Sequence, residues 1–173
     1  MSRTIETTVY TFDELSDEAK ERARDWWCAS YPLGEWWDCT YEDAKMIGLK
    51  ITGFDIGRAN EITGEFITSA IECSEAILKE HGETCETYKT AQAFCAAIDA
   101  LPELPEENDP SYWDIERDLC AANDEAEADF LQSLLEDYLI LLRHEYEYQM
   151  SDDCVDENIL ANEYEFTEEG ERA

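Results

Sequence analysis

One long run of residues, Phe130–Tyr148 (FLQSLLEDYLILLRHEYEY), is both strongly apolar and patterned like a helix. Its large side chains recur every three or four residues, which places them on one helix face: Phe130, Leu134, Tyr138, Leu141 and Leu142, widened by Leu131, Leu135 and Tyr146. Residues 138–142 (YLILL) are apolar on every side of such a helix, so we expect them to be covered on most sides. The run therefore predicts a long central helix near residues 126–149, around which the core is built.

The rest of the chain predicts short strands and several further helices. Alternation and β-branched residues favour strands at 3–10, 49–56, 62–71 and 164–166. Amphipathic spacing, N-capping Ser and Thr residues and helix-ending glycines favour helices at 17–29, 36–47, 73–80, 84–101, 111–119 and 152–162. The expected fold class is α+β, with the first strand and the hairpin in one small antiparallel sheet of about three to four strands, packed by helices. With 173 residues and 44% hydrophobic content, we expect one domain, 1–173.

Four tryptophans fall on two predicted helices separated by a proline and a glycine: Trp26, Trp27, Trp36 and Trp37. They predict an aromatic cluster that packs a helix–helix turn, because tryptophan buries a large apolar surface. The alternative interpretation is an exposed aromatic anchor for a partner protein.

Charge is the most unusual feature of the composition. The chain has 44 Asp and Glu against 12 Lys and Arg, a formal net charge of −32. Residues 102–173 are its strongly acidic part, with 24 acidic residues against Arg117, Arg143 and Arg172. Ordinary surfaces mix both signs, so this region differs from a plain solvated face. Such a surface repels nucleic acid and anionic membranes and attracts basic proteins or divalent cations.

The seven cysteines have no close pairing, and the N-terminal MSRTIETTVY contains no apolar signal core. Both features favour a reducing cytoplasm. No apolar run approaches the roughly 20 residues that a membrane-spanning helix needs, so we expect no membrane association.

Motifs that carry chemistry are absent from the sequence, which contains no CxxC, HExxH, GxSxG, calcium loop or glycine-rich phosphate loop. A zinc site using Cys73, His81 and Cys85 is the one metal alternative, weighed against structural thiols. We therefore expect a protein that is not an enzyme and that has no metal and no cofactor.

The candidate partner-binding residues are acidic clusters of the C-terminal part: Glu103, Glu106, Glu107, Asp109, Asp114, Glu116, Asp118, Asp124, Glu125, Glu127, Asp129, Glu136, Asp137, Asp152, Asp153, Asp156 and Glu157. Carboxylates three or four residues apart on a helix have Cβ atoms about 5–6 Å apart, a spacing comparable with successive phosphates of a nucleic acid. Rows of carboxylates on a rigid core are therefore expected to imitate a phosphate backbone.

The opening VYTFDELSDEAKERARDWW, the segments HGETCETYKTA and LEDYLILLRHEYEY, and the tail NEYEFTEEGER resemble a family of small acidic proteins encoded by bacteriophages and prophages. The resemblance carries no catalytic motif and implies phage origin. In charge and size, the chain is also similar to phage-encoded DNA-mimic inhibitors of restriction and CRISPR systems. The leading hypothesis is thus an inhibitor, monomeric or homodimeric, that occupies the nucleic-acid groove of a basic host defence protein. The alternative is an acidic module that binds a basic host or phage protein outside any nucleic-acid site.

Overall fold

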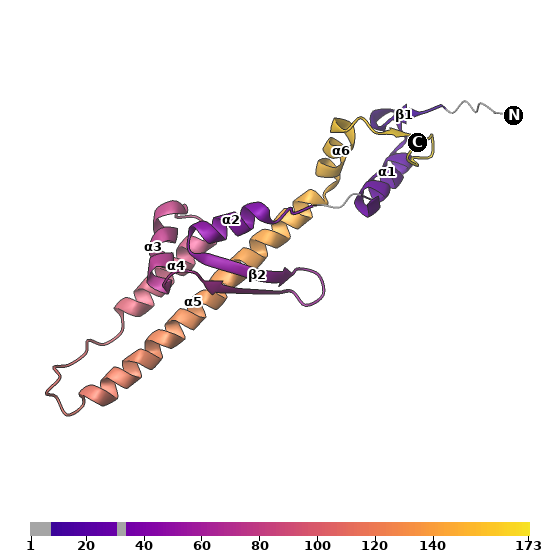
Figure 1. The fold of residues 1–173 in the computed structure, drawn as a ribbon. Helices are drawn as coiled ribbons and strands as arrows, with labels where there is room; N and C mark the ends of the chain where they lie inside the picture. Colours follow the sequence, from indigo (N-terminus) through magenta and orange to yellow (C-terminus); the bar gives the residue numbers. More distant parts are fainter. Residues whose placement is uncertain (1–7, 31–33) are drawn as a thin grey trace. The chain divides into compact units, whose positions relative to one another are not determined.

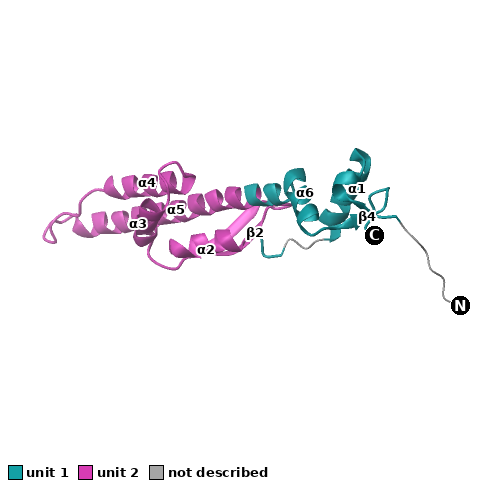
Figure 2. Cartoon of the chain, turned by 90° about the horizontal axis from the view of Figure 1, so that it is seen from above, with its two compact units in different colours: residues 1–36, 144–173 teal, residues 37–143 magenta. Residues whose placement is uncertain are grey.

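The computed structural model describes residues 8–30 and 34–173, and the chain divides into two compact units (Figures 1 and 2). Unit 1 comprises residues 1–36 and 144–173, and unit 2 comprises residues 37–143. Each unit combines helices with a two-stranded antiparallel sheet, which confirms the α+β class. The expected single sheet of three to four strands is wrong for the described residues, whose strands form two separate pairs.

The sheet of unit 1 joins the two ends of the chain. Strand β1 (Tyr10–Thr11) pairs with β4 (Glu165–Phe166), and Tyr10 lies opposite Phe166. The first strand was expected beside the hairpin at 49–71, but Phe166 completes an apolar cluster with Phe12 and Trp27, and this burial favours pairing with the C-terminal strand. Residues 3–7 of the expected first strand lie outside the described residues.

Three helical segments cover that small sheet. They are the 3₁₀ helix η1 (Phe12–Glu14), α1 (Asp17–Ser30) and α6 (Asp152–Ala161). Thr11 and Glu14 form a capping box at the start of η1. At the starts of α1 and α6, the hydroxyls of Ser16 and Ser151 accept hydrogen bonds from backbone N–H groups. Val155 and Ile159 of α6 are buried with Ala19 and Ala23 of α1. The capping residues identified in the sequence therefore predict the starts of these helices correctly.

Unit 2 begins with a helix and a hairpin. Helix α2 (Asp38–Met46) leads into β2 (Leu49–Asp55), which pairs with β3 (Glu61–Phe66) and is interrupted by a bulge between Ile51 and Gly53. The second strand ends at Phe66 rather than at residue 71. Ser69 and Glu72 form a capping box that starts α3 (Ala70–Glu80), so residues 70 and 71 are helical.

The core of unit 2 lies between that hairpin and the helices. Helix α4 (Glu86–Asp99) and α5 (Tyr112–Gln149) form a helical hairpin connected by loop 100–111 (Figure 1). Leu134 and Tyr138 of α5 are fully buried, and the rings of Phe94 and Phe130 stack with centroids 4.4 Å apart. These contacts confirm that the apolar stripe of Phe130–Leu142 builds the core.

Helix α5 starts earlier than expected and is covered less. Residues 120–129 (CAANDEAEAD) continue it without a break, because alanine and glutamate are strong helix formers, so one helix replaces the two expected at 111–119 and 126–149. Of residues 138–142 (YLILL), Tyr138, Leu139 and Leu142 are buried as expected, whereas Ile140 and Leu141 are 45% and 46% exposed, so the cover of this segment is partial. No helix among the described residues is both long enough and apolar enough to cross a bilayer.

The four tryptophans divide between the two units, with Trp37 alone in unit 2. Trp26 packs edge-on against Phe166, and Trp27 is buried in the core of unit 1. Trp36 lies against Tyr146, while Trp37 contacts Phe54 of the hairpin in unit 2. Within each unit, these rings therefore pack against other aromatic or buried side chains.

Candidate acidic interaction surface

Five of the predicted acidic residues share one exposed face of α5. They are separated by four, seven, four and seven residues, and we call them the carboxylate row: Asp114, Asp118, Glu125, Asp129 and Glu136. At about 100° per residue, this spacing keeps all five within an arc of about 60°, and at 1.5 Å per residue the row is about 33 Å long. All five residues are exposed.

Cations neutralise only one end of this row. Arg117 pairs with both Asp114 and Asp118, with N–O distances of 3.2 Å. Among the described residues, no Lys, Arg or His side chain lies within 4.0 Å of the carboxylates of Glu125, Asp129 or Glu136. Gln132 donates a 3.0 Å hydrogen bond to Glu136. The C-terminal part of the row is therefore available to an external cation.

Four other predicted acids of α5 lie off the row. Glu116 and Glu127 are half-buried on other sides of the helix, and Asn123 donates to Glu127. Asp124 is exposed beside Glu103 in a hollow formed by α4, α5 and their loop. The structure therefore does not assemble all nine predicted α5 acids into one surface.

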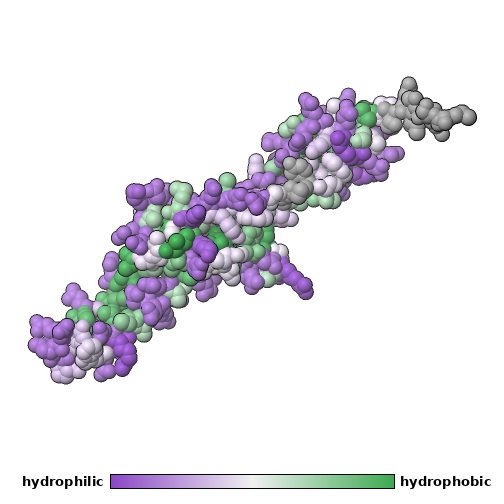
Figure 3. Space-filling view, in the orientation of Figure 1, coloured by the Kyte–Doolittle hydropathy of each residue, from purple (hydrophilic) through white to green (hydrophobic). Residues whose placement is uncertain are grey.

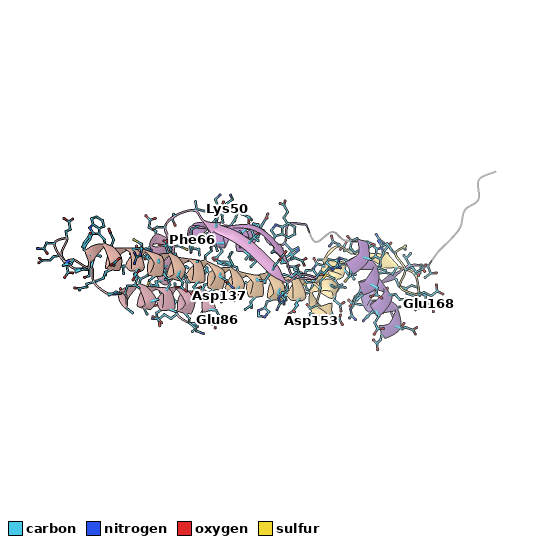
Figure 4. All side chains as sticks on the ribbon, turned by 90° about the horizontal axis from the view of Figure 1, so that it is seen from below. Lys50, Phe66, Glu86, Asp137, Asp153 and Glu168 are labelled. Carbon is cyan, nitrogen blue, oxygen red and sulfur yellow. The ribbon has the colours of Figure 1, made fainter. Side chains whose placement is uncertain are left out.

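Asp137 is a structural residue rather than a surface charge. Its carboxylate accepts a 2.6 Å hydrogen bond from the Thr90 hydroxyl of α4. Burial raises the pKa of Asp137 above its ordinary value, opposed by the Thr90 hydrogen bond and reinforced by the negative charges of Glu86 and Glu136. Figure 4 shows Asp137 on α5 and Glu86 on α4. Asp137 therefore does not belong to the candidate surface, because its carboxylate contacts Thr90 of α4.

The loop that precedes α5 carries four more predicted acids, Glu103, Glu106, Glu107 and Asp109, all of them exposed. Asp109 accepts hydrogen bonds from the Ser111 hydroxyl at 2.5 Å and from the Ser111 backbone N–H at 2.8 Å, which close the loop just before α5 begins. The hydroxyl first, and then the backbone N–H, lower the pKa of the Asp109 carboxyl. Trp113, in the first turn of α5, is 73% exposed. The loop thus extends the acidic surface of unit 2 beyond the start of the row.

The acids of α6 belong to unit 1. Asp156 receives two hydrogen bonds from the Arg24 guanidinium, at 2.6 and 2.7 Å, and Asp152 lies 3.4 Å from the same group. Asp153 and Glu157 are exposed, and Figure 4 labels Asp153. Asp156 is therefore engaged in holding α6 to α1 and does not present a free charge.

Two hollows flank the row within unit 2. The first, which we call the α4–α5 groove, has a volume of about 430 Å³, and both Glu125 and Asp129 line it. The second, of about 450 Å³, lies between α5 and β3 and is bordered by Gln132 and Glu136. The C-terminal part of the row therefore forms an exposed crest between two depressions.

The charge density of the row is lower than that of DNA. Five carboxylates over about 33 Å give one charge per about 8 Å, whereas one strand of B-DNA carries one phosphate per about 3.4 Å. The row alone therefore imitates a sparse subset of phosphates. The acids of loop 100–111 add charge at one end.

Unit 2 also contains a chain of polar contacts with the residue types of a catalytic triad. The His81 Nδ1 atom and the Thr87 Oγ1 atom share a 2.8 Å hydrogen bond, and His81 Nε2 lies 3.7 Å from Asp43. Thr87 is only 4% exposed, so its hydroxyl is covered by protein. These contacts connect α2, α3 and α4, and we interpret them as structural.

The zinc alternative at Cys73, His81 and Cys85 finds no support in this geometry. Cys73 is fully buried, and burial raises the pKa of its thiol to about 12, which disfavours the thiolate that zinc requires. Cys85 is exposed. Among the described residues, no three His, Cys, Asp or Glu side chains come together as a metal site.

The α4–α5 groove was not predicted from the sequence, because alanine carries no chemical signal. Its walls contain Ala93 and Ala97 of α4, facing Ala122 and Ala126 of α5. The available clue was that each pair is spaced four residues apart, on the same helix face. Trp113 was likewise assigned no surface role, although it is among the most exposed apolar side chains.

Comparison with known proteins gives no assignment: no family model, no curated protein and no solved structure matches this chain.

Proposed function

We propose that this chain is an acidic inhibitor that binds the basic nucleic-acid-binding groove of another protein and blocks it competitively. The observation that carries the proposal is the crest of α5, where Glu125, Asp129 and Glu136 stand exposed on one face without a cationic partner among the described residues. A groove that binds phosphates through Lys and Arg is attracted to such a fixed negative surface by the same long-range field. No catalysis is required.

The class of target follows from the phage resemblance of the sequence. We propose a host defence protein, such as a restriction or CRISPR effector, which places the chain in the cytoplasm of an infected bacterium. The net charge of −32 supports a basic protein as the partner and disfavours direct binding to nucleic acid.

A second candidate is an acidic module that binds a basic host or phage protein outside its nucleic-acid site. The sparse charge of the carboxylate row, about one per 8 Å, favours this alternative over close mimicry of a DNA strand. It needs only a cationic partner surface.

The two candidates are separated by competition. The tagged chain is used to isolate a partner from host lysate, and the purified partner is then titrated with double-stranded DNA in the presence and absence of the chain. Under the first proposal, DNA displaces the chain, and the binding weakens as salt concentration rises. Simultaneous binding of DNA and chain contradicts mimicry and supports the second candidate.

Variants then locate the surface. The triple variant Glu125→Gln/Asp129→Asn/Glu136→Gln should weaken binding by about 3- to 150-fold, because each exposed ion pair contributes about 0.2–1 kcal/mol. It should also flatten the salt dependence. The matched control removes the same three charges from unit 1, as Asp153→Asn/Glu157→Gln/Glu168→Gln. An equal loss in both variants would show that net charge, not the row, determines binding.

A further inference from the structure

The α4–α5 groove is apolar along its floor and walls and acidic on one rim. The rings of Phe94 and Phe130 line it, and each is no more than 5% exposed. Figure 3 shows hydrophobic (green) atoms on the α4–α5 hairpin, beside a hydrophilic (purple) end formed by loop 100–111. The two rings form the covered floor, and the apolar surface that a partner can reach comes from the exposed Ala93 and Ala97 of α4 and the half-buried Ala122 and Ala126 of α5.

The dimensions of the groove fit a helix. Its lining extends from Ala122 to Ser133 along α5, which is about 16 Å or three helical turns. The alanines on its walls have small side chains, so the axis of a third helix can approach both helices within the usual packing distance of about 8–10 Å. A small compact ligand would leave most of this length empty.

The charged residues on the rim of the groove determine which kind of partner helix it can bind. Glu125 and Asp129 stand one turn apart on the α5 rim, and the residues that line the groove from α4 are Thr90, Ala93, Phe94 and Ala97, none of them charged. Lys or Arg residues four positions apart on a partner helix would meet these two carboxylates, which lie about 6 Å apart along α5. The net charge of −32 disfavours a second copy of this chain on the same acidic rim.

We propose that the α4–α5 groove is a docking site for an amphipathic, basic helix of the partner protein, with its apolar face in the groove and its basic edge on Glu125 and Asp129. This inference rests on the proposed function in one respect, namely that the partner is a basic protein. It deepens that function by naming the partner element and the apolar part of the contact. Binding therefore depends on shape as well as on charge.

The probe is a synthetic helical peptide of about 15 residues, long enough to cover three turns, with Ala and Leu on one face and Lys along one edge. Binding to the full chain is measured by fluorescence anisotropy at several salt concentrations. A second peptide keeps every Lys but replaces the apolar face with Ser and Gln. The first peptide should bind at least 10-fold more tightly than the second.

Two tryptophan substitutions test the groove itself. Ala97→Trp fills the groove, whereas Ala96→Trp adds the same ring to an exposed position of α4 that does not line it. Far-ultraviolet circular dichroism checks that both variants keep the helical content of the parent chain. Ala97→Trp should lose at least 10-fold in affinity for the first peptide, and Ala96→Trp should bind as the parent does.

The outcomes separate this inference from the proposed function. Equal binding by Ala97→Trp and Ala96→Trp, or equal binding of the two peptides, overturns the groove as a docking site. If Glu125→Gln/Asp129→Asn still weakens binding in that case, the acidic partner surface stands and only the groove is wrong. If neither the groove variant nor the charge variant changes binding, both proposals fail.

Discussion

The hydroxyl of Tyr138 donates a 2.7 Å hydrogen bond to the carboxylate of Asp43, which connects the middle of α5 to α2. Tyr138 is fully buried, whereas the side chain of Asp43 is 49% exposed. Burial, with a further contribution from the hydrogen bond, raises the pKa of Tyr138 far above its ordinary value, so the hydroxyl remains a donor at physiological pH. The contact helps to fix the rotation of α5 that turns Glu136 outward.

Replacing Tyr138 with Phe should therefore lower the free energy of unfolding by about 1.5–3 kcal/mol, the usual contribution of a hydrogen bond to a charged acceptor, while the ring still fills the core. Urea denaturation measures the change. In a double-mutant cycle with Asp43→Ala, the two effects should be less than additive. Additive effects would show that the hydrogen bond contributes nothing to stability.

The α+β class and most helix positions were predictable because they depend on local signals. Ser16 and Ser151 cap the helices that were expected to follow them, and Phe130–Leu142 supplies the core stripe. Strand pairing was not predictable, because it depends on which apolar surfaces meet across the chain. Phe166 lies opposite Tyr10, 156 positions away along the sequence, and no local pattern specifies that choice.

The candidate surface was predictable in composition and not in geometry. The acidic residues were correctly identified as exposed at Glu125, Asp129 and Glu136. The structural roles of Asp137 and Asp156 were missed, because their partners Thr90 and Arg24 are distant in sequence. Because acidic residues are so numerous in this sequence, their pattern does not distinguish the few that form structural contacts from those that are free.

Asp137 should make stability depend on pH in a defined direction. Its pKa is raised in the folded state, so the ionised carboxylate lowers stability at neutral pH. That penalty is absent below the ordinary pKa of 3.8, where the carboxyl is protonated in both the folded and the unfolded state. It develops as pH rises through the raised pKa of the folded state.

Asp137→Asn, which can still accept from Thr90, should therefore be more stable than the parent at pH 7, and this advantage should vanish near pH 3. Urea denaturation across this pH range measures it. Asp129→Asn is the matched control, because it removes the same charge from an exposed site on the same helix. A larger gain for Asp129→Asn would show that general charge repulsion, rather than burial of Asp137, determines the effect.

The hairpin depends on a glycine where it approaches α5. A Cβ atom at Gly64 would lie 2.7 Å from a methyl group of Leu135 and 2.7 Å from the backbone oxygen of Lys50. Gly64→Ala should therefore lower the free energy of unfolding by about 1–3 kcal/mol, as overpacking of a core does. Gly53→Ala is the control, because its Cβ would meet Thr63 at an ordinary 3.6 Å. Equal stability of the two variants, measured by urea denaturation, would mean that the hairpin moves away from α5 without cost.

Asp156 was predicted from the sequence to bind a partner, whereas its contacts in the structure indicate a role in stability. Its two hydrogen bonds with Arg24 raise the pKa of the guanidinium, and the two side chains are 26% and 24% exposed. Asp156→Asn should lower the free energy of unfolding of unit 1 by about 1 kcal/mol, because it removes a charge-assisted pair that water screens only in part. Hydrogen exchange at the amides of α1 and α6 measures this change locally.

Asp153→Asn is the matched control, since Asp153 lies on the same helix, carries the same charge and is exposed. It should leave amide exchange in α1 and α6 unchanged. If the amides exchange equally slowly in Asp156→Asn and in Asp153→Asn, the Arg24–Asp156 pair does not hold α6 to α1. Asp156 is then a free carboxylate that a partner can bind. Faster exchange in Asp156→Asn alone places Asp156 among the residues that maintain the fold, as the two short hydrogen bonds from Arg24 indicate.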